Sequence, residues 1–325
     1  MTRRPTPIVC ALLAGTVAAT TASLASAEPT SDSLSFTRLA TVEHMGRIDV
    51  NPFSGEIAVG TTGPGFGAAN RIRVVSPDGG VRAVGDAVPD PDAVAWDIDA
   101  SIGLPGSILV GGIGGVYSVG AYDGFTAQVF EPSPGLVNPE DMALAANGEL
   151  VFADYNTGRI QSVNGRGDFT TLARSARPVN QITLSGSGDM LFADQSGGAL
   201  VPSSGGPMSF DALSIATPAD AFLVGLAFGD GSALWGTDTY AVDRTTGDLL
   251  RFGESSTSII ATGLLAGFDP LDAGRAPDAD IGFLPTGEMV IAIPSENTIW
   301  TVVPSPSTVA LLGLGGLTAM VRRRK

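Results

Sequence analysis

A sixteen-residue pattern occurs twice in the middle of the chain, at a spacing of forty residues. Pro139–Asp154 reads PEDMALAANGELVFAD, and Val179–Asp194 reads VNQITLSGSGDMLFAD. Asp278–Ile293 has the same plan around its own Gly turn, Pro285–Glu288. Each copy predicts a short apolar strand, a Gly turn and a second apolar strand, and a third short strand follows the first copy at 158–163.

The period of this repeat predicts an all-β fold. Four short strands in about 40–50 residues are typical of one blade of a β-propeller. Weaker copies complete a set of blade starts near residues 46, 92, 140, 180, 223 and 278. We therefore predict a six-bladed β-propeller; the alternative is a seven-bladed ring in which residues 238–271 form a further partial blade. No long stretch outside the two termini keeps the helical period.

The last predicted blade has room for only three strands. Residues 34–42 precede the first blade and have the pattern of a spare strand. We predict that this strand completes the last blade and closes the ring, which removes exposed sheet edges. The composition agrees, since 44% hydrophobic residues, 43 Gly and 22 Pro suit an all-β protein with a large core and many turns.

The N-terminus predicts export. Residues 1–27 begin with two arginines, continue with an apolar stretch over 8–19 and end in Ala25–Ala27, an order typical of a secretory signal peptide. Its removal takes away Cys10, the only cysteine of the chain. No disulfide would then support residues 28–303, the predicted propeller domain.

The C-terminal tail, 304–325, predicts sorting at a membrane. A Pro/Ser motif precedes an apolar run over 309–321 and a basic end. This order resembles the PEP-CTERM sorting signal of Gram-negative bacteria, except that Ser replaces the name-giving Glu. The residues that carry the resemblance are Val303, Pro304, Ser305, Pro306, Ser307, Thr308, Arg322, Arg323 and Arg324. It implies an apolar sorting helix that enters the membrane at least transiently, an exosortase-type membrane enzyme as partner, and a cell-surface or extracellular location. The alternatives are a plain C-terminal membrane anchor and a buried helix with a charged end.

The mature chain is predicted to be strongly acidic. Loss of both ends removes six basic residues and no acidic ones, which moves the formal net charge from −15 to −21. Nucleic acids and anionic lipid surfaces bind basic footprints. This charge therefore argues against both as partners.

The repeat also carries a resemblance to known propellers. Phe152–Ile160 reads FADYNTGRI, and Phe192–Asp194 repeats its first three residues. This pattern, a strand that ends in Ala-Asp and a turn before Arg-Ile, resembles NHL and SMP-30/gluconolactonase-like propellers. We predict a structural role for Asp154 and Asp194, because a short carboxylate at a strand end caps turn amides.

The resemblance implies one divalent metal, such as Ca²⁺, at the channel mouth. Counting back eight residues from the turn glycine selects Glu140 and Asn180, and Asp92 lies at the comparable place. Such oxygen ligands suit a hard cation that polarises a lactone carbonyl and activates water. The same count gives Arg47 in the first blade and Leu223 in the fifth, so the ligand set is incomplete. A cation at Arg47 would oppose metal binding if it points inward.

Other chemistry finds little support in the sequence. His44 is the only histidine and is predicted to be structural, because no nucleophile elbow of convincing context accompanies it. Arg166–Asp168 spells a cell-adhesion tripeptide, but we predict a hairpin turn there. Gly111–Gly115 lacks the Lys and helix of a phosphate loop, so we predict that it lets a strand turn or approach another backbone closely.

Two functions therefore stay open. The sequence favours an exported, exosortase-sorted propeller that acts as a non-enzymatic binding or scaffold module, with an extracellular polysaccharide or a surface protein as its partner. The alternative is a metal-dependent SMP-30-like lactonase or related hydrolase that uses Asp92, Glu140 and Asn180. A structural Ca²⁺ site without catalysis is a third possibility.

Overall fold

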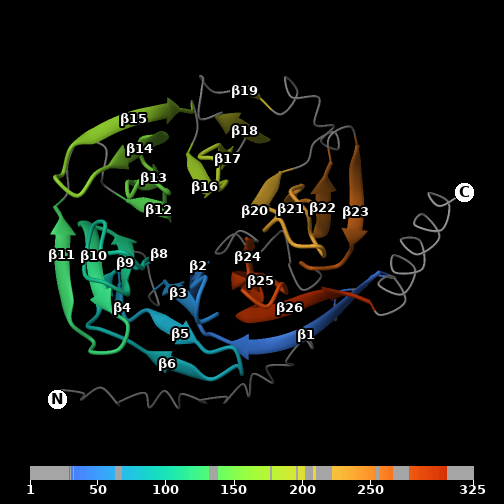
Figure 1. Ribbon diagram of the computed structural model, residues 1–325, viewed down its shortest axis with the longest axis horizontal. Coiled ribbons are helices and arrows are strands. Elements are labelled where there is room, and N and C mark those ends of the chain that lie inside the picture. The colour runs from blue at the N-terminus through green and yellow to red at the C-terminus, as the bar shows by residue number, and fades with distance from the viewer. Residues whose placement is uncertain are drawn as a thin grey trace, which may run out of the picture.

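The structure, a computed structural model, is an arrangement of short antiparallel strands around one axis (Figure 1). It describes residues 29, 31, 33–62, 68–131, 138–175, 178–194, 197–201, 208–209, 222–253, 256–265 and 278–305. The regular structure of this part is strands and a 3-10 helix, η2 (Pro294–Glu296). The all-β propeller predicted from the repeat is confirmed.

The strands of the described residues form six four-stranded sheets. The first three contain, from the axis outward, β2 (Met45–Val50), β3 (Ile57–Thr61), β5 (Arg73–Val75) and β6 (Val81–Ala83); β8 (Ala93–Asp97), β9 (Ser107–Gly112), β10 (Gly115–Gly120) and β11 (Thr126–Phe130); and β12 (Pro139–Leu144), β13 (Leu150–Asp154), β14 (Arg159–Val163) and β15 (Phe169–Arg174). A two-stranded sheet pairs β4 (Ala69–Asn70), which lies between β3 and β5 in sequence, with β7 (Val88–Pro89), which lies between β6 and β8.

The other three sheets follow the same plan. They contain β16 (Val179–Leu184), β17 (Met190–Asp194), β18 (Gly197–Val201) and β19 (Met208–Ser209); β20 (Leu223–Phe228), β21 (Thr239–Asp243), β22 (Asp248–Phe252) and β23 (Thr257–Ala261); and β24 (Asp280–Phe283), β25 (Met289–Ile293), β26 (Thr298–Pro304) and β1 (Leu34–Thr41). The innermost strands β2, β8, β12, β16, β20 and β24 begin within two residues of the predicted blade starts. The strands β21, β22 and β23, which the seven-bladed alternative would have assigned to a further partial blade, belong to the β20 sheet.

The Gly turn of the repeat joins the first two strands of a sheet. Gly148, Gly188 and Gly287 occupy equivalent positions and have φ values of 82°, 87° and 94°. Side chains with a Cβ rarely adopt this conformation, so glycine sets the tight hairpin at this position. The turn keeps the inner strands short and brings their starts to one end of the channel.

The last sheet joins the two ends of the described chain. β1 runs antiparallel to β26, in a register that pairs Leu34 with Pro304 and Thr41 with Thr298. The N–H of Ser305 donates to the carbonyl oxygen of Ser33 at 2.7 Å, which extends the contact past the strand. The first residues of the predicted sorting motif, Val303 and Pro304, are therefore part of a paired strand.

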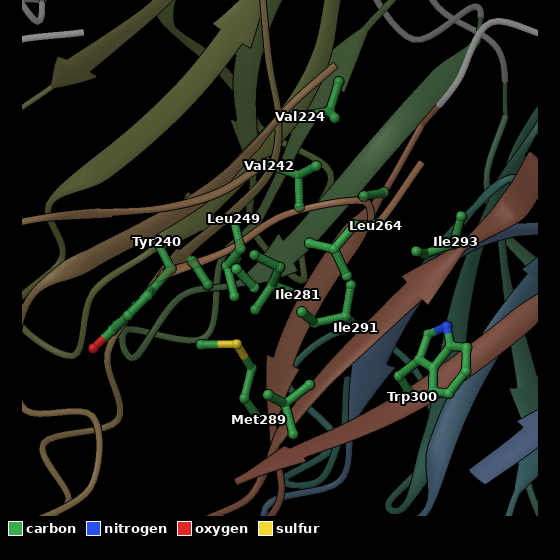
Figure 2. Packing of buried hydrophobic residues seen from close by; sticks show 14 of the residues in the cluster. Val224, Tyr240, Val242, Leu249, Leu264, Ile281, Met289, Ile291, Ile293 and Trp300 are labelled. Carbon is green, nitrogen blue, oxygen red and sulfur yellow. The ribbon is translucent and has the colours of Figure 1, made fainter. Parts of the chain in front are cut away.

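The hydrophobic core is divided into clusters, each shared by two neighbouring sheets. Six such clusters lie between consecutive sheets, including one between the β24 and β2 sheets. Figure 2 shows the cluster between the β20 and β24 sheets, where Val242 and Leu249 face Ile281 and Ile291. Both faces of a sheet are therefore buried against neighbours, and the stability of each sheet depends on the sheets beside it.

Two predicted segments fall outside the described residues: the signal peptide, 1–27, and most of the sorting tail, 306–325. Over the part of the chain that the structure describes, no helix has the length and apolar character needed to span a membrane.

Removal of β1 is expected to destabilise the whole domain. A chain that begins after Val42 loses the ladder with β26 and the apolar contacts of Leu34, Phe36, Ala40 and Val42. At about 1.5–3 kcal/mol for each large side chain withdrawn from the core, the free energy of unfolding should fall by at least about 3 kcal/mol. Urea unfolding of this chain and of a chain that begins at Ser31 measures the difference.

The control is the addition of a free peptide of residues 31–42, which should restore part of the lost stability in the shorter chain. Equal stability of the two chains would contradict a closing role for β1.

Candidate functional site

The inner strands carry a polar side chain that binds the next sheet. In four sheets, an inner-strand carboxylate or amide oxygen accepts a hydrogen bond from a backbone N–H of the following inner strand. The pairs are Asp49 with Trp96 (2.6 Å), Asp141 with Ile182 (2.8 Å), Gln181 with Leu226 (3.3 Å) and Asp280 with Ile48 (2.8 Å). These bonds fix the inner strands relative to one another around the channel.

The carboxylates of this set are held away from water. Burial raises the pKa of Asp49 to about 7 and that of Asp280 to about 6, although backbone N–H donors oppose the shift. Burial and the charge of Asp280 raise the pKa of Asp141 well above its usual range, while Arg47 opposes this. Burial thus disfavours the ionised form of these three carboxyls more than their hydrogen bonds favour it.

Arg47 extends from β2 across the channel. Its side chain is 3% exposed, and its Nη1 and Nη2 each lie 2.9 Å from a carboxylate oxygen of Asp278. Its guanidinium also donates to the carbonyl oxygens of Ala279 at 3.3 Å and Asn180 at 2.7 Å. Burial opposes its charge, but Asp278, Asp141 and other carboxylates outweigh this and raise its pKa. The side chain of Arg47 therefore points inward, an orientation that the sequence left open.

The three predicted metal ligands begin neighbouring inner strands. Glu140 is the second residue of β12, Asn180 is the second residue of β16, and Asp92 directly precedes β8. Burial and then the charges of Glu140 and Asp90 raise the pKa of Asp92 to about 8. Burial and Asp278 raise that of Glu140 to about 7, against the opposing charge of Arg47. Because Glu140 acts on Asp92, and Asp90, Asp278 and Arg47 act on both, Asp92 and Glu140 share one electrostatic environment.

Two oxygens at the mouth are buried without a hydrogen-bond partner. They are Oδ1 of Asp92 and Oδ1 of Asn180. Oδ1 of Asn138, the residue before β12, is also buried without a partner. A buried oxygen that accepts no bond costs free energy, about 1–3 kcal/mol. A cation that prefers oxygen ligands would supply the missing partner of these oxygens. These oxygens therefore fit a divalent cation, but the inward guanidinium of Arg47, bonded to Asp278 and to the carbonyl of Asn180, is a neighbouring positive charge that opposes one.

The described residues contain no group of three or more His, Cys, Asp or Glu side chains arranged to hold a metal. A site here would therefore depend on the amide oxygen of Asn180 as well as on the carboxylates of Asp92 and Glu140. The sequence reasoning selected these three residues but gave no role to Asp278, Asp90 or Arg244. Asp278 pairs with Arg47 only through folding, and no local pattern reveals that contact.

The structural roles predicted for two other motifs are confirmed. Asp154 is fully buried, and its carboxylate accepts N–H bonds from Asn138 at 3.0 Å and Thr157 at 2.9 Å. Arg166–Asp168 lies in the turn between β14 and β15, where the N–H of Gly167 donates to the carbonyl of Asn164. The side chain of Asp194 lies outside the described residues.

The glycine-rich segment and His44 also have structural surroundings. Gly112 approaches the carbonyl oxygen of Pro89 so closely that a Cβ would lie 2.2 Å from it, which confirms a close approach between backbones. His44 has a φ of 56°, its N–H donates to the side chain of Asn297, and its carbonyl accepts from the N–H of Thr62. The backbone of His44 thus holds the start of β2 against η2.

Comparison with known proteins adds a fold-level relationship. No protein-family model and no curated protein matches the sequence. A gluconolactonase from Xanthomonas campestris has a similar structure, with a TM-score of 0.61 and 12% identity over 83% of this chain and 89% of that one. A calcium-binding regucalcin from Agrobacterium tumefaciens has a TM-score of 0.59 and 15% identity over 81% and 91%. Virginiamycin B lyase from Staphylococcus aureus has a TM-score of 0.53 and 15% identity over 83% and 99%. At these identities the likeness shows the propeller fold alone.

Asp49→Asn is expected to flatten the pH dependence of stability. The pKa of Asp49 is about 7 in the fold against 3.8 for an unperturbed carboxyl, so the native state binds more protons between these values. Its contribution to the free energy of unfolding is greatest below pH 3.8 and is lost as the pH rises through about 7, by at most about 4 kcal/mol. Urea unfolding at about pH 5 and about pH 8 measures the slope.

Asp86→Asn is the matched control, because Asp86 is exposed and its substitution removes the same charge. The control should keep the wild-type slope. A slope in Asp49→Asn equal to that of the wild type would show that Asp49 titrates alike in both states.

Proposed function

We propose that the channel mouth binds one divalent cation, such as Ca²⁺, and that the protein is a hydrolase of small lactones or similar esters. The observation that carries the proposal is the pair of buried, unpartnered oxygens, Asp92 Oδ1 and Asn180 Oδ1, beside the raised-pKa carboxyl of Glu140. Bound there, the cation would polarise the ester carbonyl and activate water. In the overall reaction the acyl carbon–oxygen bond breaks, and water supplies a hydroxyl to the acyl carbon and a hydrogen to the leaving oxygen.

The protein's own residues have distinct parts in this proposal. Asp92, Glu140 and Asn180 supply oxygen ligands from three inner strands, which the bonds between those strands hold in place. Asp278 holds Arg47 in a two-oxygen ion pair, which keeps the guanidinium from binding the other carboxylates. A gluconolactonase and a calcium-binding regucalcin have a similar fold, and this likeness supports the proposal of a cation-dependent lactone hydrolase.

A non-enzymatic binding module is the second candidate function. The observation that favours it is Arg47, a buried cation within the channel that already pairs with Asp278. If Arg47 alone balances the carboxylates, the mouth needs no metal, and the contacts with a polysaccharide or a surface protein would come from the loops. Cation binding therefore separates the two candidates.

We further propose that the six sheets are the six blades of one ring and that the domain acts outside the cytoplasm. The support for export is the sequence of the two ends: a signal peptide over 1–27 and a PEP-CTERM-like tail over 304–325. An exosortase-type enzyme would process the tail, and a Gram-negative-type bacterium would be the source. The acidic body, without a lysine before the tail, is in keeping with an exported domain.

The double variant Glu140→Ala, Asn180→Ala is expected to lose both cation binding and lactone hydrolysis. In the wild-type protein, a cation at a hundred times its dissociation constant should add about 2.7 kcal/mol to the free energy of unfolding. Thermal unfolding with chelator and then with Ca²⁺, Mn²⁺ or Zn²⁺ measures this, and a panel of lactones measures hydrolysis.

Glu149→Ala is the matched control, since Glu149 lies just before β13, at the far end of the hairpin that begins with Glu140. It should keep the shift and the activity. Unchanged activity in the double variant would rule out this site. A wild-type protein that no cation stabilises would favour the binding module.

Export is tested by fractionation of the producing bacterium. The mature chain should begin at or near Glu28 and be found outside the cytoplasm, because the signal peptide is removed on export. A variant that lacks residues 304–325 should fold but be released or sorted differently. Recovery of the full-length chain in the cytoplasm would contradict the proposal.

A further inference from the structure

Arg244 lies at the channel mouth, in the turn between β21 and β22. Its backbone N–H donates to the carbonyl of Phe222 at 2.7 Å, and its guanidinium carbon lies 4.8 Å from the centre of the Phe222 ring. Phe222 precedes β20 and packs against the hydrophobic cluster between the β20 and β24 sheets. The cation of Arg244 is thus fixed on a ring that the core holds in place.

No carboxylate forms an ion pair with Arg244 within the described residues. The ion pairs found there join Arg47 with Asp278, Arg82 with Glu56, and Arg251 with Asp238. Asp278 acts on the charge of Arg244, but both of its oxygens are already bonded to Arg47. Burial lowers the pKa of Arg244, which remains charged at any physiological pH. Among the residues that the structure describes, the guanidinium of Arg244 therefore keeps donors for a ligand.

The position of Arg244 is repeated in the β12 sheet. Arg244 follows Asp243, whose carboxylate accepts the N–H of Phe222 at 3.3 Å; Tyr155 follows Asp154, whose carboxylate accepts the N–H of Asn138 at 3.0 Å. Arg244 and Tyr155 thus occupy equivalent places above the starts of two inner strands. The backbone N–H of Tyr155 donates to the carbonyl of Asn138 at 3.1 Å, as that of Arg244 does to Phe222, so the two residues lie at the same end of their sheets.

We infer that Arg244 is a specificity-determining residue and that the ester opened at this mouth carries an ionised carboxylate, which the guanidinium binds. The inference rests on the proposed function and deepens it. A guanidinium offers two parallel N–H donors that match the two oxygens of a carboxylate. A carboxylate is favoured over a phosphate because it carries a single negative charge, which one guanidinium balances, whereas a phosphate carries about two.

The test compares two lactones that differ by one ionised carboxylate group: γ-butyrolactone and its 3-carboxylate. With the cation-loaded protein, Arg244→Gln should lower kcat/KM for the carboxylate roughly 10- to 100-fold, mostly through KM. The kcat/KM for γ-butyrolactone should be unchanged. Arg244→Lys keeps the charge without the paired donors and should recover part of the loss.

Arg251→Gln is the matched control. Arg251 lies in β22 of the same sheet and pairs with Asp238, and its substitution by Gln removes the same charge. It should leave both lactones unaffected. An equal loss on both lactones in Arg244→Gln would overturn the inference, because it would mean a structural role.

Binding measurements separate a loss of lactone hydrolysis from a loss of carboxylate recognition by Arg244. If the wild-type protein opens neither lactone, calorimetric binding of γ-butyrolactone-3-carboxylate decides the matter. Binding that Arg244→Gln loses and Arg251→Gln keeps would support anion recognition without catalysis. Absence of binding to the wild-type protein would overturn the inference.

Discussion

Pairing of β1 with β26 is the contact on which the rest of the structure depends. It joins residues 34–41 to residues 298–304 and so links the beginning of the described chain to its end. Each hydrophobic cluster lies between two neighbouring sheets, so a ring left open would expose one face of its first and last sheets. Closure of the ring is therefore a condition for burying the core. It brings the two ends of the described chain together, which costs conformational entropy.

Closure also creates the candidate site. Because every inner strand starts at the same end of the channel, residues far apart in sequence meet there: Arg47 reaches Asp278 across 231 positions and Asn180 across 133. The convergence concentrates carboxylates in a small volume away from water, which raises the pKa of Asp92 and Glu140. One guanidinium compensates only part of this charge, and that imbalance is the physical basis for expecting a cation.

The fold was largely predictable from the sequence, because its determinants are local. A Gly turn with positive φ and the apolar strands beside it repeat along the chain, so Gly148 and Gly188 mark equivalent hairpins. The site was predictable only in part. Counting from those glycines located Glu140 and Asn180, but the inward course of Arg47 depends on Asp278, a partner that no local pattern indicates. Arg244 was missed for the same reason, since its meaning comes from Phe222, twenty-two residues earlier.

The contrast between Tyr155 and Arg244 suggests how one scaffold serves different chemistry. Both follow a buried Asp that binds the start of an inner strand, so the backbone position is fixed by folding. The side chain at that position contributes little to this bond and is free to vary between sheets. Asp154 and Asp243 therefore stabilise the fold, and the residue that follows each of them would determine which ligand binds. A propeller whose rim carries a guanidinium at one such position and a phenol at another is asymmetric where its repeat is regular. On the proposal made above, that asymmetry would orient a small ligand relative to Asp92 and Glu140, which a symmetric rim would not do.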